Sequence, residues 1–264
     1  MDDVDVMKIL NNMIEQVIID VNEDYVGKKV CVLGQFRSYN KKDGDKKHLV
    51  LSVFARELYE EQGISMEIFH DSMADMHWKL LECHKMYGIW GTFVIDWFPW
   101  WFRLKRFALG RLQFELRPFE GKEDCELDGV CIHPGDTVIN MHIPSAGPMK
   151  PELLEDAFAR AEVFFKEYFP EDYTIFGVES WLIDPDLVRI LPEGNMKAYA
   201  KRFQLIEVQK SDEIFPDGWR VFGAEWKKKP EDLPRNTGLQ RAIADYLQQG
   251  GRLGNGYGIF VRKK

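Results

Sequence analysis

The alternation of apolar and polar positions divides the chain into two regions with different periods. Up to about residue 102, apolar residues recur every three or four positions, which is the spacing of amphipathic helices. Residues 1–22 and 64–87 both carry this pattern, so we expect a helix in each. Residues 28–36 and 48–54 flank a charged turn, and their pattern suits either two strands or pieces of helix.

Beyond residue 102 the period shortens and strands become frequent. Strands are expected at 110–120, 137–144, 173–183, 204–209, 219–226 and 257–263, and helices at 151–169, 194–203 and 237–249. Strands mixed with only a few helices predict a mixed sheet, and hence the α+β class. The change of period predicts a mostly helical N-terminal domain over residues 1–105 and a second domain over 106–264.

Charge and composition narrow the classes of partner. The net charge is −8, which argues against nucleic acid or an anionic membrane surface as a partner. No apolar run reaches the roughly 18 residues of a membrane span, so no stable membrane insertion is expected. The aromatic stretch 88–102 is interpreted as a buried cluster, with a membrane-surface anchor as the alternative.

The four cysteines show neither a paired motif nor regular spacing, and no signal peptide is recognised at the N-terminus. Both observations predict reduced thiols in a cytoplasmic protein. Nothing in the pattern indicates an oligomeric state.

The turn from Ser145 to Pro151 joins an expected strand to an expected helix. The backbone amides of this turn, including those of Ser145, Ala146 and Gly147, could hold a phosphate at the helix N-terminus. Two features favour a purely structural corner instead. Prolines remove donors, and acidic residues in the first helical turns, Glu152, Glu155 and Asp156, repel an anion.

Two further candidates lie within expected strands. His142 sits near the end of one strand between apolar residues, and Glu179 interrupts the apolar strand 173–183. An acid inside a strand is either solvated or part of a site. No metal site is expected: His70, His77 and His84 are seven residues apart, or about 10 Å along a helix, too far for one ion.

Several sequence motifs of the second region resemble those of a known protein family. "HIPSAGP" before a helix, "ESWLIDPDL", "LPEGNMKAYAKRFQL" and "LPRNTGLQRAIADYLQQGG" resemble bacterial acyltransferase domain-containing proteins, which join a helical acyltransferase-type N-terminal domain to a GNAT-like C-terminal domain. The expected order β–α–β–α–β–β from Thr137 to Trp226 is similar to a GNAT core.

The resemblance implies transfer of an acyl group from acetyl-CoA or another acyl-CoA to an amine of a small molecule. It implies that strand 138–143 splays from strand 173–183, and that Ser145, Ala146 and Gly147 contact the pyrophosphate. Asn195 would begin the following helix beside the cofactor. Glu179 and His142 are then the candidate bases, and Tyr199 the candidate acid for the departing thiolate.

Two other hypotheses stay open from the sequence. The turn "SAGPMKP" lacks the leading Gln or Arg and the second Gly of the usual pyrophosphate loop, which would suit a non-catalytic GNAT-like binding or assembly protein. A metal-dependent hydrolase centred on the histidine-bearing helix would need ligands from a second element, and the sequence suggests none.

Overall fold

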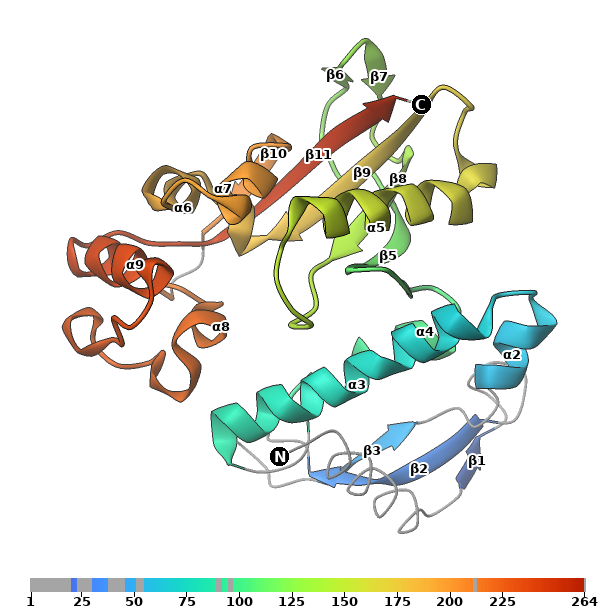
Figure 1. Cartoon of the computed structure of the whole chain (residues 1–264), viewed down its shortest axis with the longest axis horizontal. Helices are drawn as coiled ribbons and strands as arrows, with labels where there is room; N and C mark the ends of the chain where they lie inside the picture. The colour runs from blue at the N-terminus through green and yellow to red at the C-terminus, as the bar shows by residue number, and fades with distance from the viewer. Residues whose placement is uncertain are drawn as a thin grey trace. The chain divides into compact units, whose positions relative to one another are not determined.

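The structure is a computed structural model that describes residues 20–22, 30–37, 46–50, 55–88, 92–94, 97–210 and 213–263. The chain forms two compact units, residues 1–108 and 109–264 (Figure 1). Most of the helix expected at 1–22 lies outside the described residues, and its last three residues form strand β1 (Asp20–Asn22) instead.

The described residues of the first unit form a small sheet and three helices. In the two segments left open as strand or helix, the described residues form strands β2 (Val30–Arg37) and β3 (Lys46–Val50). With β1 they make an antiparallel sheet in the order β1-β2-β3. The helices are α2 (Ala55–Glu61), α3 (Met66–Tyr87) and α4 (Pro99–Phe102). The start of α3 is capped by the Ser65 hydroxyl, and its end by Gly88 in the left-handed conformation.

Part of the aromatic stretch expected to be buried lies in a core cluster of this unit. Phe98, Trp101 and Phe102 pack with Ala55 and Leu80 and are at most 4% exposed. Trp100 is the exception, at 44% exposure. Within the described residues, no helix is long and apolar enough to cross a membrane.

A six-stranded sheet organises the second part of the chain, in the order β10-β11-β9-β8-β5-β4 (Figure 1). The strands are β4 (Phe107–Leu109), β5 (Leu112–Pro118), β8 (Thr137–His142), β9 (Tyr173–Ser180), β10 (Gln204–Gln209) and β11 (Asn255–Lys263). β8 and β9 are parallel, whereas β5–β8, β9–β11 and β10–β11 are antiparallel. This mixed sheet confirms the α+β class.

The two faces of the sheet are covered by different elements. Helix α5 (Pro151–Phe164) joins β8 to β9 across one face (Figure 1). On this face Phe158 packs on Phe114, Phe176 and Phe260. Such parallel strands need a crossover of this kind. The other face packs on the hairpin β6 (Cys125–Leu127) and β7 (Val130–Ile132), through a cluster of Phe119, Cys125, Ile132, Val138, Ile175, Tyr257 and Ile259.

The remaining elements lie around β9 and after β10 in the chain. One short 3-10 helix, η2 (Lys166–Tyr168), precedes β9. Between β9 and β10 lie the 3-10 helix η3 (Trp181–Ile183) and the helices α6 (Pro185–Ile190) and α7 (Asn195–Ala200). After β10 come α8 (Gly218–Phe222), the 3-10 helices η4 (Gly223–Glu225) and η5 (Pro230–Asp232), and α9 (Gly238–Gln248). The strand expected at 219–226 is wrong, because this segment is α8 and η4. Its apolar residues at 219, 222 and 226 have helical spacing, and Gly223 ends the helix with a φ of 59°. The last strand of the core is therefore β11.

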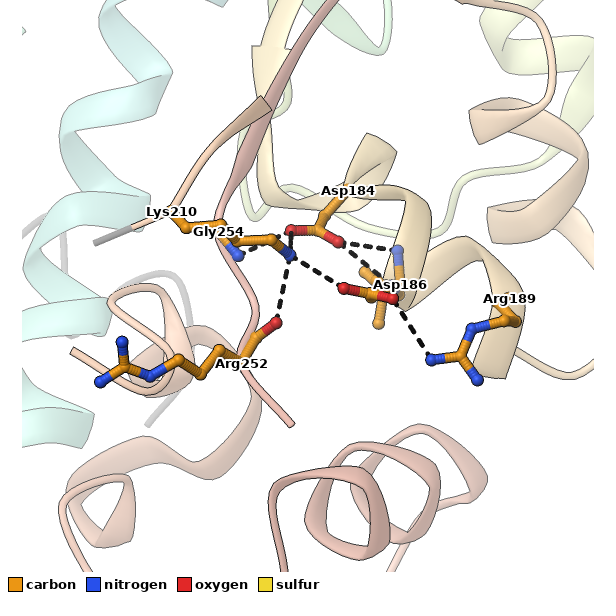
Figure 2. Close-up of polar contacts among 7 residues, drawn as sticks. Asp184, Asp186, Arg189, Lys210, Arg252 and Gly254 are labelled. Atoms are coloured by element: carbon orange, nitrogen blue, oxygen red, sulfur yellow. Dashed lines mark hydrogen bonds and ion pairs between the residues drawn. The ribbon is translucent and has the colours of Figure 1, made fainter. Parts of the chain in front are cut away.

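Asp184 connects three of these elements through a buried carboxylate (Figure 2). It accepts hydrogen bonds from the amide of Asp186 at 2.8 Å, capping α6, and from the amide of Gly254 at 2.7 Å, just before β11. Lys210, at the end of β10, donates to Asp184, to Asp186 and to the carbonyl of Arg252. Although burial raises the pKa of Asp186, hydrogen bonds from Lys210 and Arg189 outweigh it and hold that pKa below its usual value.

We expect the Asp184→Ala substitution to destabilise the protein by about 3–5 kcal/mol, because it leaves the buried amide of Gly254 and the first amides of α6 without their acceptor and removes the buried partner of Lys210. Asp184→Asn keeps the cap and should cost less. Urea unfolding followed by tryptophan fluorescence measures both, with exposed Asp172→Ala as the matched control. A loss below about 1 kcal/mol for Asp184→Ala would contradict this role.

Candidate functional site

The site is organised by the end of the parallel strand pair. β8 and β9 are paired from Ile139–Phe176 to Met141–Val178, and in these described strands the register ends there. His142 and Glu179, one residue further along each strand, lie beyond the last pair. The two strands form no residue pair past this point, although each still pairs with its other neighbour, His142 with Gln113 of β5 and Glu179 with Tyr257 of β11.

His142 makes the most specific polar contact near this opening. Its Nε2 lies 2.9 Å from Oε1 of Glu115 on β5, and the Asn140 amide lies 3.3 Å from the same ring nitrogen. The side chains of His142 and Glu115 are only 18% and 7% exposed. A carboxylate can only accept, so the shorter contact selects the Nε2–H tautomer over the Asn140 NH2 contact, which would need an unprotonated Nε2. The Nδ1 lone pair is then the basic atom of the ring. This arrangement of an acid behind an imidazole is the one that orients a catalytic base.

Glu179 lies on the same face of the sheet as His142. Strand alternation places His142, Asn140 and Glu115 on the face that also carries Glu179, and Glu179 pairs in register with Tyr257 of β11. The Glu179 side chain is exposed. Of the two candidate bases, His142 is therefore the one held by neighbouring side chains, and Glu179 the one open to solvent.

Tyr199 lies on the opposite face. It is 1% exposed, and its hydroxyl is 3.3 Å from the sulfur of Met141, the last paired residue of β8. Burial raises the pKa of Tyr199 well above its usual value, against the opposing charges of Arg202 and Arg111. The phenol is thus held protonated within one residue of the end of the β8–β9 pair. Asn195 begins the short helix α7 and is exposed.

The turn after β8 is held by an arginine from a distant part of the chain. Arg111 donates to the carbonyl oxygens of Pro144 at 2.9 Å, Gly147 at 2.7 Å and Pro148 at 3.1 Å. In a trans peptide the N–H points opposite to the C=O. The amides of Ser145 and Met149, which share peptides with two of these carbonyls, therefore point away from Arg111. Gly147 adopts a φ of 122°, which favours glycine.

The acidic residues expected to repel an anion here are largely neutralised. Glu155 is paired with Arg202 at 2.6 Å and with Arg262 at 3.1 Å, and Asp156 is paired with Arg160 at 2.8 Å. Lys150 precedes α5 with no side-chain cap on the helix. The corner thus offers outward amides and the N-terminus of α5. Of the three acidic residues near that end, Glu155 and Asp156 are neutralised by arginines.

Sequence reasoning missed Glu115 and Arg111. Glu115 carried the same signal as Glu179, an acid within an apolar strand, and applying that criterion to "GRLQFEL" would have found it. Arg111 had no such signal, because it contacts carbonyls 33 to 37 residues away in the chain. The histidines of α3 join no group of potential metal ligands among the described residues; the group that does occur is Asp124, Cys131 and His133.

A mixed sheet with one parallel pair that opens beside a helix N-terminus defines a GNAT-like domain. Residues 106–260 match the GNAT-like C-terminal domain, and residues 47–104 match the N-acyltransferase N-terminal domain. The chain belongs to this GNAT-like family, as the sequence motifs implied. No curated protein matches it.

Solved structures with the same fold include acyltransferases. One is an acyltransferase in complex with decanoyl-CoA and teicoplanin, with a TM-score of 0.64 and 24% identity over 78% of this chain and 62% of that one. Another is an acyltransferase in complex with CoA and 10C-teicoplanin, with a TM-score of 0.64 and 23% identity over 78% of this chain and 61% of that one. The chain thus spans under two thirds of the length of these proteins.

We expect Glu115 to fix the tautomer of His142. In the wild-type protein neutral His142 should carry its proton on Nε2, and in Glu115→Leu this preference should be lost with the acceptor. Nitrogen-15 NMR of labelled histidine measures the tautomer, with His142→Gln used to assign the signal and Glu126→Leu, an exposed acid, as the control. An Nδ1–H tautomer in the wild type would contradict this arrangement.

Proposed function

We propose that this protein is an acyl-CoA-dependent N-acyltransferase that acts on an amine of a small molecule. The contact that carries the proposal is the one between His142 and the buried Glu115, beside the point where β8 and β9 part. Membership in a family whose two domains are described as acyltransferase domains supports it. So does the presence of acyl-CoA in acyltransferases of the same fold.

Bound acyl-CoA supplies a thioester, whose carbon forms the new C–N bond and whose C–S bond breaks. The ammonium form of the acceptor gives its first proton to solvent, and the neutral amine then attacks. The task of His142 is to take, on Nδ1, the second proton, which the nitrogen loses as the C–N bond forms, while Glu115 stabilises the imidazolium that results. Glu179, exposed on the same face, attracts the positively charged form of the amine before this step. His142 is therefore the base, and Glu179 a group that binds the acceptor.

The face of the sheet opposite to His142, on which Tyr199 lies, is suited to bind the acyl-CoA. The ends of β8 and β9 beyond Met141 and Val178 would contact the amides of a pantetheine arm, and the corner from Ser145 to Met149 would contact the pyrophosphate through backbone amides. The protonated Tyr199 lies beside Met141 and is the nearest candidate to give a proton to the departing thiolate. Because it is buried, Tyr199 must become accessible when the cofactor enters. Asn195, at the start of the helix that carries Tyr199, is proposed as a further cofactor contact.

We place the protein in the cytoplasm, where coenzyme A thioesters would be its substrates. The thiols of Cys83, Cys125 and Cys131 are free, which supports a reducing compartment.

Calorimetric titration with CoA, acetyl-CoA and decanoyl-CoA tests the proposed function directly, followed by an assay of free thiol released in the presence of an amine panel. We expect binding below millimolar concentration and a loss of thiol release of about 10²-fold or more in His142→Gln. A folded wild-type protein that binds none of the three would refute the acyltransferase and favour a non-catalytic GNAT-like binding protein.

We expect Arg111→Lys to weaken CoA binding by about tenfold or more, because a lysine cannot bond three carbonyls and the loop amides lose their orientation. The affinity for acyl-pantetheine, which lacks the pyrophosphate, should not change. Arg160→Lys, which alters an exposed pair on α5, is the matched control. Equal CoA affinity in Arg111→Lys and wild type would show that Arg111 does not order the loop.

A further inference from the structure

The hairpin β6–β7 presents several potential metal ligands on one face. Its register pairs Cys125 with Ile132 and Glu126 with Cys131, around a turn at Asp128-Gly129 in which both residues have positive φ. Cys125 and Ile132 are buried in the cluster beneath the hairpin. Strand alternation therefore places Glu126 and Cys131 on the outer face.

The residues flanking the two strands lie on the same outer face. They are Asp124, before β6, and His133, after β7, and both are exposed together with Glu126 and Cys131. One ligand atom from each of Asp124, Cys131 and His133 lies within 4.8 Å of the others. Nδ1 of His133 is already 2.9 Å from Oδ1 of Asp124, and the His133 amide donates to Asp136 at 2.7 Å.

These distances are close to those of a metal site. Ligand atoms around a tetrahedral zinc ion lie about 3.3–3.8 Å apart, given bonds of roughly 2.0–2.3 Å. Rotation of these exposed side chains can shorten the distances between ligand atoms by the remaining ångström. A thiolate and an imidazole are ligands that select zinc over magnesium or calcium.

We propose that the outer face of the β6–β7 hairpin binds a zinc-class divalent cation through the Cys131 thiolate, the His133 imidazole and the Asp124 carboxylate. The flexible Glu126 side chain, opposite Cys131 in register, completes the fourth position. The site is independent of the proposed acyl transfer and uses none of its residues.

The metal would have a structural role. Two strands of three residues are too short to be stable alone, and this hairpin covers the apolar part of the sheet face that carries His142. A cation that joins β6 to β7 from outside holds Cys125 and Ile132 against that face. Binding only to the folded state also raises stability by mass action.

Titration of the full-length protein with Co²⁺, a spectroscopic substitute for zinc, tests the site. We expect one equivalent to give a thiolate-to-cobalt charge-transfer band and the visible bands of a tetrahedral ion, and Zn²⁺ to abolish both by displacement. Cys131→Ser and His133→Ala should each lose the charge-transfer band or weaken binding at least tenfold. Both positions are exposed, so the variants should fold.

Cys125→Ala, which removes the inward thiol of the same hairpin, is the matched control and should keep the band. Zn²⁺ should raise the melting temperature of the wild type and leave that of Cys131→Ser unchanged. A wild-type protein without the charge-transfer band, or a band that survives in Cys131→Ser, would overturn the proposal.

Discussion

The pairing of β8 with β9 is the constraint on which the site depends. It is the parallel contact in a sheet whose other defined pairs are antiparallel, and it extends over three residue pairs. A parallel pair requires a crossover, which brings the N-terminus of α5 to the end of β8. The pairing of β8 with β9 stops at Met141 and Val178, just before the corner that leads into this helix. The acid–imidazole pair and the phenol lie on either side of this opening.

Two long-range polar contacts hold the rest of the second unit around that opening. The Arg111 guanidinium fixes the corner after β8 by donating to three of the corner's carbonyl oxygens. The amides of the corner therefore point outward although it contains Pro144, Pro148 and Pro151. Asp184 holds the start of α6, the end of β10 and the start of β11 together. The motif "IDPDL", one of those that carried the family resemblance, thus contains a structural carboxylate.

Local pattern predicted the elements whose period was unambiguous. Strand alternation and the apolar stripe of α5 gave β5, β8, β9 and α5 within a few residues, because each buries one regular face. The segment 219–226 was assigned as a strand although Trp219, Phe222 and Trp226 recur at helical spacing. Residues 28–36 and 48–54 stayed open, since short segments of this kind suit both periods until a neighbouring strand pairs with them.

The sequence by itself determined the α+β class, the change in the spacing of apolar residues near residue 105, and the residues at the strand ends, His142 and Glu179. The tertiary structure decided which of them has a partner. His142 acquires one because β5 places Glu115 beside it, 27 residues away in the chain, whereas Glu179 stays exposed. The physical reason is that cross-strand and loop contacts depend on register and crossover geometry, which local hydrophobic pattern does not encode.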